Sequence, residues 1–257
     1  MTTSTARFER NADADQQAFR LQATFRVLLD AMARPGEVQR LFGLADEAAL
    51  AARAGLMPAT MLLADALLDS ATSLAVTGEE GTRSERLLVR RFHACARDQR
   101  SAAYVVVPVS VRGDVAAACV QGVTAGTLEA PHLGATCIVE CSTLLGRGRD
   151  GTVTGSSSNA SHVAPDQYGE PGSVAAAVAS AQAATEWRIT GPGVDGSAVI
   201  ACDRGDVLRA RVEREDEFPC GIDVVLVDGA GHVIAIPRSS AIECAGALED
   251  GGCSWDM

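Results

Sequence analysis

The sequence predicts an α/β protein, with a sheet that carries helices on both faces. Segments with helical spacing of apolar residues alternate with short β-branched apolar runs along the whole chain. The two most apolar runs, Val224–Val227 and His232–Ile236, flank the four-residue connection Asp228–Gly231, which is typical of a β-hairpin. Because these runs are nearly continuous rather than alternating, we expect other elements to cover both faces of the hairpin.

The first half of the chain mixes predicted helices and strands. Residues 1–15 are polar, and we expect a flexible N-terminus there. A helix is predicted from Gln16 to Arg34, where Pro35 and Gly36 end it. Two further helices are predicted at 46–54 and 59–68, and strands at 72–77, 86–93 and 104–107.

The second half continues this mixture and contains an unusual segment. A helix at 114–121, a strand at 135–145, strands at 186–190 and 198–202 and a solvent-facing helix at 205–217 precede the hairpin. Residues 146–172 are rich in Gly, Ser, Asp and Thr, which predicts a mobile insertion, followed by an Ala-rich helix at 174–185. We therefore expect a single α/β domain over 16–245 with a flexible tail at 246–257.

Composition excludes several classes of function. The net charge of −11 argues against a nucleic-acid partner or an anionic membrane surface, although a local arginine cluster that binds phosphate stays possible. The chain has no lysine, because all 22 basic residues are arginines. A phosphate loop that needs lysine and a lysine Schiff base with pyridoxal phosphate are therefore both excluded.

The cysteines and the apolar segments indicate a cytoplasmic protein. The eight cysteines have no spacing typical of zinc or iron–sulfur ligands, so we predict buried reduced thiols and no metal. We see no signal peptide, and no apolar run approaches the ~20 residues that span a bilayer, so no membrane is expected.

Five residues are candidates for binding substrate or phosphate: Arg34, His93, His132, Asp223 and Arg238. The arginines stand at the ends of predicted elements, which suits guanidinium forks to phosphate and suits ordinary ion pairs equally. Asp223 begins the first hairpin strand and Arg238 follows the second, so a core hairpin with a charged residue at each end is the simpler interpretation. His93 lies near Cys95, and His132 lies in a loop. No residue is identified as catalytic.

Several short motifs occur in a characteristic order along residues 16–244. They are Phe25–Arg26 with Leu28–Gly36, Arg91–His93, Gly126–Pro131 with Gly134–Thr136, Thr190–Val194, and Phe218–Asp223 with Pro237–Ser240. The ordered set resembles the PhnH family, the H subunit of the bacterial carbon–phosphorus lyase core complex.

The resemblance implies a fold similar to the large domain of pyridoxal-phosphate-dependent transferases, without the cofactor. It also implies a homodimer that assembles with the G, I and J subunits. With G and I, the family forms α-D-ribose 1-phosphonate 5-triphosphate from an alkylphosphonate and MgATP, the substrate of the complex, in organic phosphonate catabolism. The chain would thus be a subunit of a transferase complex, ribose 1-methylphosphonate 5-triphosphate synthase, and not catalytic by itself. The alternative is a stand-alone nucleotide- or phosphate-ester-binding enzyme on the same fold.

Overall fold

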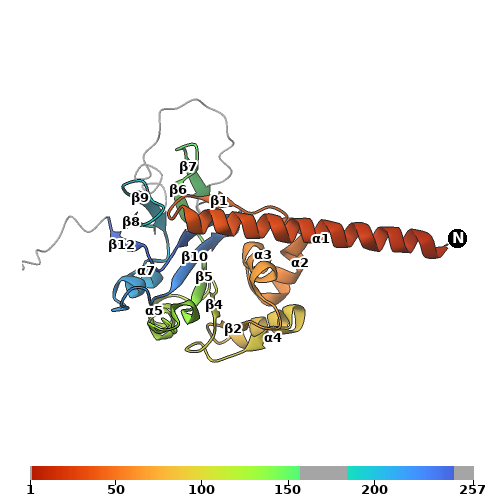
Figure 1. Cartoon of the computed structure of the whole chain (residues 1–257), viewed down its shortest axis with the longest axis horizontal. Coiled ribbons are helices and arrows are strands. Elements are labelled where there is room, and N and C mark those ends of the chain that lie inside the picture. The colour runs from red at the N-terminus through yellow and green to blue at the C-terminus, as the bar shows by residue number, and fades with distance from the viewer. Residues whose placement is uncertain (1, 157–183, 246–257) are drawn as a thin grey trace, which may run out of the picture.

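The computed structural model describes residues 2–156 and 184–245. They form a mixed α/β structure with a seven-stranded sheet and a five-stranded sheet (Figure 1). The prediction of a sheet with helices on both faces is confirmed for the larger sheet. The second sheet was not predicted, because its strands were recognised singly and nothing in their sequences shows how they pair.

The larger sheet is parallel at its centre and antiparallel at one edge. In spatial order its strands are β1 (Gln39–Arg40), β11 (His232–Ile236), β10 (Asp223–Asp228), β5 (Thr136–Cys141), β4 (Tyr104–Val107), β2 (Ser73–Val76) and β3 (Cys95–Ala96). The predicted hairpin is confirmed as β10 and β11, with Val225 opposite Ala235. Every residue of these two strands is buried, as their continuous apolar character predicts.

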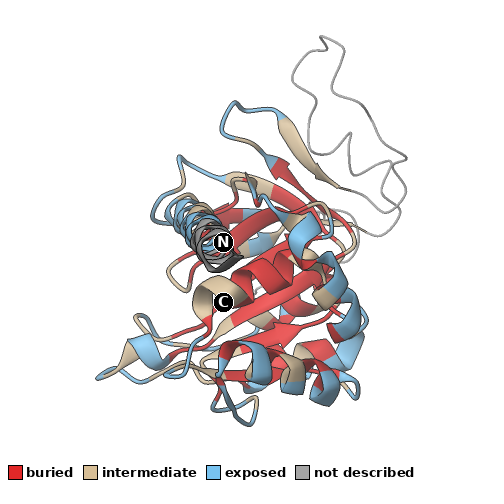
Figure 2. Cartoon of the chain, turned by 90° about the vertical axis from the view of Figure 1, so that its right-hand side faces the viewer, coloured by how far each residue is buried: buried red, intermediate tan, exposed pale blue. Residues whose placement is uncertain are grey.

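Helices cover both faces of this sheet, and the buried strands lie between them (Figure 2). The first face carries α1 (Thr2–Ala33), α2 (Leu44–Ala54), α3 (Pro58–Leu67) and α4 (Gly81–Phe92). The second face carries α5 (Gly113–Gly122) and α7 (Gly205–Val212). Pro58 occupies the first turn of α3, where its missing N–H costs nothing.

No single helix in the described part of the chain is both long and apolar enough to cross a membrane. The helices α2 and α3 meet that requirement only when taken together, and they are bent by 97° relative to each other.

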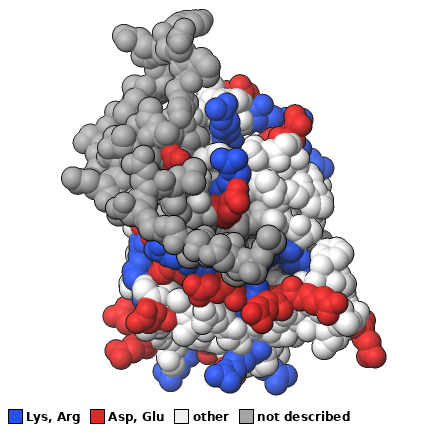
Figure 3. Space-filling view, turned by 90° about the vertical axis from the view of Figure 1, so that its left-hand side faces the viewer, with Lys and Arg blue, Asp and Glu red and all other residues white. Residues whose placement is uncertain are grey.

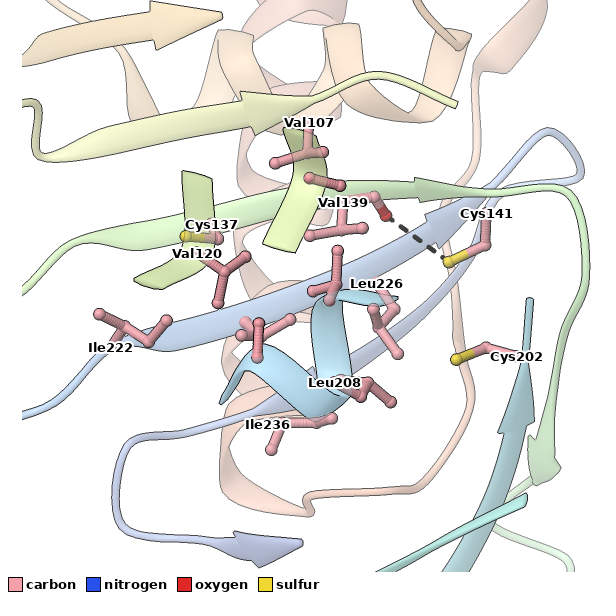
Figure 4. Packing of buried hydrophobic residues seen from close by; sticks show 14 of the residues in the cluster. Val107, Val120, Cys137, Val139, Cys141, Cys202, Leu208, Ile222, Leu226 and Ile236 are labelled. Carbon is pink, nitrogen blue, oxygen red and sulfur yellow. Dashed lines mark hydrogen bonds between the residues drawn. The ribbon is translucent and has the colours of Figure 1, made fainter. Parts of the chain in front are cut away.

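The smaller sheet is antiparallel and shares the core of the second face. In spatial order its strands are β12 (Ala241–Cys244), β8 (Thr185–Thr190), β9 (Ala198–Cys202), β6 (Leu144–Arg147) and β7 (Val153–Ser156). The fully buried Trp187 and Ile200 belong to the same cluster as Leu226. Figure 4 shows part of this cluster, which includes Leu208 of α7 and Leu226 of β10, and the Cys141 thiol donates to the carbonyl oxygen of Val139 at 3.7 Å.

The helix α4 corrects the prediction of a strand at 86–93. Its buried residues Ser84, Leu88 and Phe92 recur every four positions, whereas Arg86 and Arg90 are exposed. This is the period of an amphipathic helix. The strand prediction relied on the local content of Leu, Val and Phe and missed that period.

Other boundaries also differ from the predictions. The helix α1 begins at Thr2, earlier than the predicted start at Gln16, and the flexibility of residues 1–15 stays a prediction. The predicted strand 135–145 divides into β5 and β6, and the start of the predicted insertion forms the β6–β7 hairpin. The helix α7 ends at Val212 and buries Val207 and Leu208, so it does not simply face solvent.

The remaining predictions are confirmed or untested. The strands β2, β4, β8 and β9 and the helices α2, α3 and α5 lie close to their predicted positions. The rest of the insertion, most of the Ala-rich helix at 174–185 and the tail at 246–257 lie outside the described residues. The single domain over 16–245 stays a prediction.

Candidate functional site

Between β2 and β4, the order in which successive strands are added to the sheet reverses. The strand β2 is followed by α4 on the first face and by β3 on one side. The strand β4 is followed by α5 on the second face, and then by β5 and β10 on the other side. In open α/β sheets, ligands bind outside the carboxyl ends of the strands at such a point. The topology therefore places a candidate site at the carboxyl ends of β2 and β4.

A crevice of about 250 Å³ lies at this position, and we call it the switch-point crevice. It is lined by Gly55, Thr77, Gly78, Glu79, Glu80, Gly81, Ser84, Pro108, Ser110 and Val111. Close approach requires glycine at two places. A Cβ on Gly78, whose φ is 97°, would lie 2.6 Å from Val111 Cγ2, and a Cβ on Gly81 would clash with the Val76 carbonyl oxygen.

The crevice holds few groups that could perform chemistry. The Thr77 hydroxyl and the Cys119 thiol form a hydrogen bond of 3.0 Å, and the Ser84 hydroxyl donates to the Ala54 carbonyl at 2.5 Å. Glu79 and Glu80 are exposed carboxylates, and no histidine lines the crevice. Within the described residues, no three His, Cys, Asp or Glu side chains are grouped as metal ligands.

The buried carboxylate of Glu140 holds together elements that surround the crevice. Its side chain is fully buried and accepts hydrogen bonds from the Met57 amide (2.6 Å), the Thr60 hydroxyl (2.6 Å) and the Val109 amide (3.0 Å). Burial of a charge is costly unless such donors satisfy it. Glu140 therefore joins the start of α3 to the end of β4, and we interpret it as a structural group.

Two charged residues after β9 join the two sheets. The fully buried Arg204 donates to the carbonyls of Glu140 (2.7 Å) and Val111 (2.9 Å). Its neighbour Asp203 accepts from the Thr143 amide (3.2 Å) and from Arg112 Nη2 (2.7 Å). These bonds hold the start of α7 and the loop before α5 against the carboxyl end of β5.

The buried carboxylate of Asp228 lies at the turn of the hairpin. His232 Nδ1 lies 2.8 Å from Asp228 Oδ2, and the Ser156 hydroxyl donates to the same oxygen at 2.5 Å. The amides of Ala230 and His232 donate to Asp228 Oδ1. Serine and histidine thus share one carboxylate oxygen instead of forming a serine–histidine–aspartate relay. The arrangement caps the turn.

The structure brings together two of the five predicted site residues, Asp223 and Arg238. Arg238 Nη2 lies 2.5 Å from Asp223 Oδ2, and the Arg238 amide donates to Asp223 Oδ1 at 2.8 Å. The hydrogen bond that the Arg238 guanidinium donates to Asp223 raises the pKa of Arg238. The same guanidinium donates to the carbonyls of Pro131 and Gly134, which flank His132. This cluster holds the loop of His132 against the hairpin.

The Asp223–Arg238 cluster lies at the opposite end of the strands from the switch-point crevice. Asp223, Thr136 and Tyr104 are the first residues of β10, β5 and β4 and stand in register. Burial, followed by the charges of Asp69 and Asp223, raises the pKa of Tyr104. The His132 side chain is exposed. The interpretation of a core hairpin with a charged residue at each end accounts for this geometry, and a phosphate-binding role stays a prediction.

The other two predicted residues lie elsewhere. Arg34 follows α1 and forms ion pairs with Asp30 (2.9 Å) and Glu37 (3.0 Å). His93 caps the end of α4 with a left-handed φ of 61°, and its side chain is exposed. None of the five residues lines the switch-point crevice.

Sequence reasoning missed the groups that organise the crevice. Glu140 is the only charged residue within β5, and a lone carboxylate in an apolar strand is a recognisable signal. The carbonyls that Arg204 binds are 64 and 93 positions away, and the only nearby partner among its side-chain contacts in the described residues, Asp206, does not indicate them.

The family model described as "Bacterial phosphonate metabolism protein (PhnH)" matches residues 12–165 and 165–243. The search of curated proteins finds no match. The family match covers most of the chain and agrees with the ordered motifs. The chain therefore belongs to the PhnH family of bacterial phosphonate metabolism proteins.

Proposed function

We propose that the chain is the H subunit of a carbon–phosphorus lyase core complex and that it serves assembly rather than catalysis. The observation that carries this proposal is the family match over residues 12–243. It is supported by the described polar groups, since the buried charges Glu140, Asp228 and Arg204 are all engaged in structural hydrogen bonds.

An exposed apolar stripe on α1 supports a role in assembly. The helix has 32 residues, which corresponds to about 48 Å, and extends beyond the rest of the molecule (Figure 1). Leu21, Phe25 and Leu29 recur every four positions along it and are 37%, 44% and 52% exposed. Contiguous exposed apolar side chains are typical of protein interfaces. We assign this stripe to contact with a partner subunit.

The proposed reaction belongs to the complex as a whole. With the G and I subunits, the homodimeric chain contributes to forming α-D-ribose 1-phosphonate 5-triphosphate from MgATP and an alkylphosphonate. This transfer precedes cleavage of the carbon–phosphorus bond in organic phosphonate catabolism. We also propose a cytoplasmic location and kinship of the larger sheet with the large domain of pyridoxal-phosphate-dependent transferases. The absence of lysine fits a relative without that cofactor.

Co-expression with the candidate G, I and J subunits tests the proposal. Native mass spectrometry is expected to show one stoichiometric complex that contains two copies of this chain. The Phe25→Glu/Leu29→Glu variant is expected to lose the partners, because two carboxylates would be buried in the interface. The control Leu128→Glu changes an apolar residue that is 62% exposed in a loop and is expected to retain them.

Two results would contradict the proposal. One is a homodimer that leaves all partners behind. The other is turnover of ATP with a phosphonate by the purified chain alone, which would favour the stand-alone nucleotide- or phosphate-ester-binding enzyme.

A further inference from the structure

A groove of about 630 Å³ runs between α2 and α4, and we call it the arginine groove. Its charged lining comprises Arg53, Arg83, Arg86, Arg90, Arg91 and one carboxylate, Glu79. Five positive charges therefore face one negative charge in a chain whose net charge is −11. We propose that the arginine groove binds the polyphosphate group of a small anionic ligand.

The arginines of the groove are unpaired within the described part of the chain. Arginines elsewhere, such as Arg34, Arg214 and Arg238, each form an ion pair with a carboxylate. None of the five groove arginines does so among the described residues. In Figure 3, by comparison, basic and acidic side chains lie beside each other over the described part of the face shown. Like charges on one face of a helix lower the stability of that helix. An anion bound in the groove would offset this repulsion.

The spacing of the arginines fits an extended anion better than a single phosphate. Arg83, Arg86 and Arg90 stand at i, i+3 and i+7 of α4 and so share one face of the helix. At 1.5 Å per residue, the stripe is about 10 Å long. Arg53 in the last turn of α2 adds a charge from the facing element. Guanidinium groups bind phosphate oxygens through paired hydrogen bonds, so a chain of linked phosphates offers each arginine a partner.

The groove also has room for a part of the ligand that carries no charge. Leu50 and Leu87 contribute apolar surface beside the arginines. The volume lies within the range of about 300–1,000 Å³ that is typical of sites for small molecules. Glu79 lines both this groove and the switch-point crevice, so the two hollows adjoin at the start of α4. The inference goes beyond the proposed role in assembly, which requires no ligand on this chain.

Isothermal titration of the full chain with sodium tripolyphosphate tests the inference, with inorganic phosphate as the shorter probe. Saturable binding of tripolyphosphate at one site per chain is expected, with weaker binding of phosphate. The Arg86→Gln/Arg90→Gln variant is expected to bind at least about tenfold more weakly, because it removes two charge-assisted contacts. Both side chains are exposed, so the variant should keep the wild-type melting temperature.

Two controls separate the groove from general charge effects. Arg40→Gln removes an exposed arginine of β1 outside the groove and is expected to leave the affinity unchanged. Arg86→Lys/Arg90→Lys keeps the charge and is expected to bind with intermediate affinity, since lysine cannot form the paired contacts.

The inference is overturned if tripolyphosphate does not bind saturably, or if Arg40→Gln weakens binding as much as the groove variant. It is also overturned if tripolyphosphate fails to bind while the groove variant loses its partner subunits in native mass spectra. The groove would then be a docking surface for an acidic protein. If the unmodified chain does not bind tripolyphosphate but still assembles into the complex, that result would contradict this inference alone and leave the proposed function standing.

Discussion

Replacing Arg238 with glutamine tests whether the Asp223–Arg238 cluster is structural. The substitution removes the ion pair to Asp223 at 2.5 Å and the donors to the carbonyls of Pro131 and Gly134. The Asp223 side chain, 12% exposed, would keep the Arg238 amide as a donor but lose its countercharge. Breaking such a half-buried pair is expected to lower the free energy of unfolding by about 2–4 kcal/mol. For a chain of this size, that corresponds to a fall in melting temperature of about 4–16 °C.

The assay is thermal and urea unfolding of the single variants Arg238→Gln and Asp223→Asn and of the double variant. If the pair is structural, the double variant should lose less stability than the sum of the two single variants, by about 1–3 kcal/mol. Arg188→Gln is the control, because Arg188 and Glu243 form an exposed pair at 3.5 Å, and a change below about 1 kcal/mol is expected. An unchanged melting temperature for Arg238→Gln would refute this reasoning and direct attention to a role of Arg238 in binding phosphate.

Three further substitutions or conditions probe the crevice and the core. Arg204→Met should lower the free energy of unfolding by about 3–5 kcal/mol, because it leaves the carbonyls of Glu140 and Val111 without a buried donor. Urea unfolding measures this change, and a loss below about 1 kcal/mol would contradict the prediction. Gly81→Ala should cost about 1–3 kcal/mol by thermal unfolding, since its Cβ would meet the Val76 carbonyl, whereas the control Gly122→Ala has open space and should cost nothing. Burial raises the pKa of Cys202 to about 12 and the pKa of Cys137 and Cys141 above the usual value of 9.0. The unfolded chain therefore releases these protons first, so the stabilisation is complete below pH 9 and is lost as the pH rises towards 12. Melting temperatures that stay constant from pH 8 to pH 11 would argue against buried thiols.

The hairpin could be predicted because its information is local. The β-branched residues of β10 and β11 and the two glycines in their connection determine a pair of strands without reference to the rest of the chain. Likewise, the end of α1 follows from Pro35 and Gly36, which cannot continue a helix. The helix α4 was mistaken for a strand because Leu87, Leu88 and Val89 are consecutive, and only the wider spacing of Ser84, Leu88 and Phe92 reveals a helix.

The switch-point crevice could not be predicted for a different reason. Its position depends on which side of β2 the strands β3 and β4 join, and that is a property of the whole sheet. The arginine groove likewise combines Arg53 of α2 with residues of α4. If residues 86–93 formed a strand, as predicted, neighbouring side chains would point to opposite faces of the sheet, and the arginines would not gather on one face. The contact between Asp223 and Arg238, in contrast, follows from hairpin register, so naming them as a possible pair was within reach of sequence reasoning.

The smaller sheet has a consequence for the order in which the chain can fold. It gathers strands from three stretches of sequence, β6–β7, β8–β9 and β12, and the β10–β11 hairpin of the larger sheet lies between the second and the third in sequence. During synthesis from the N-terminus, β8 therefore lacks its partner β12 until the hairpin has already been made. Such long-range pairing slows folding and leaves strand edges exposed in the meantime. A ribosome-bound chain that stops before Ala241 would present β8 as an open edge, so we expect the nascent protein to depend on chaperones until β12 emerges.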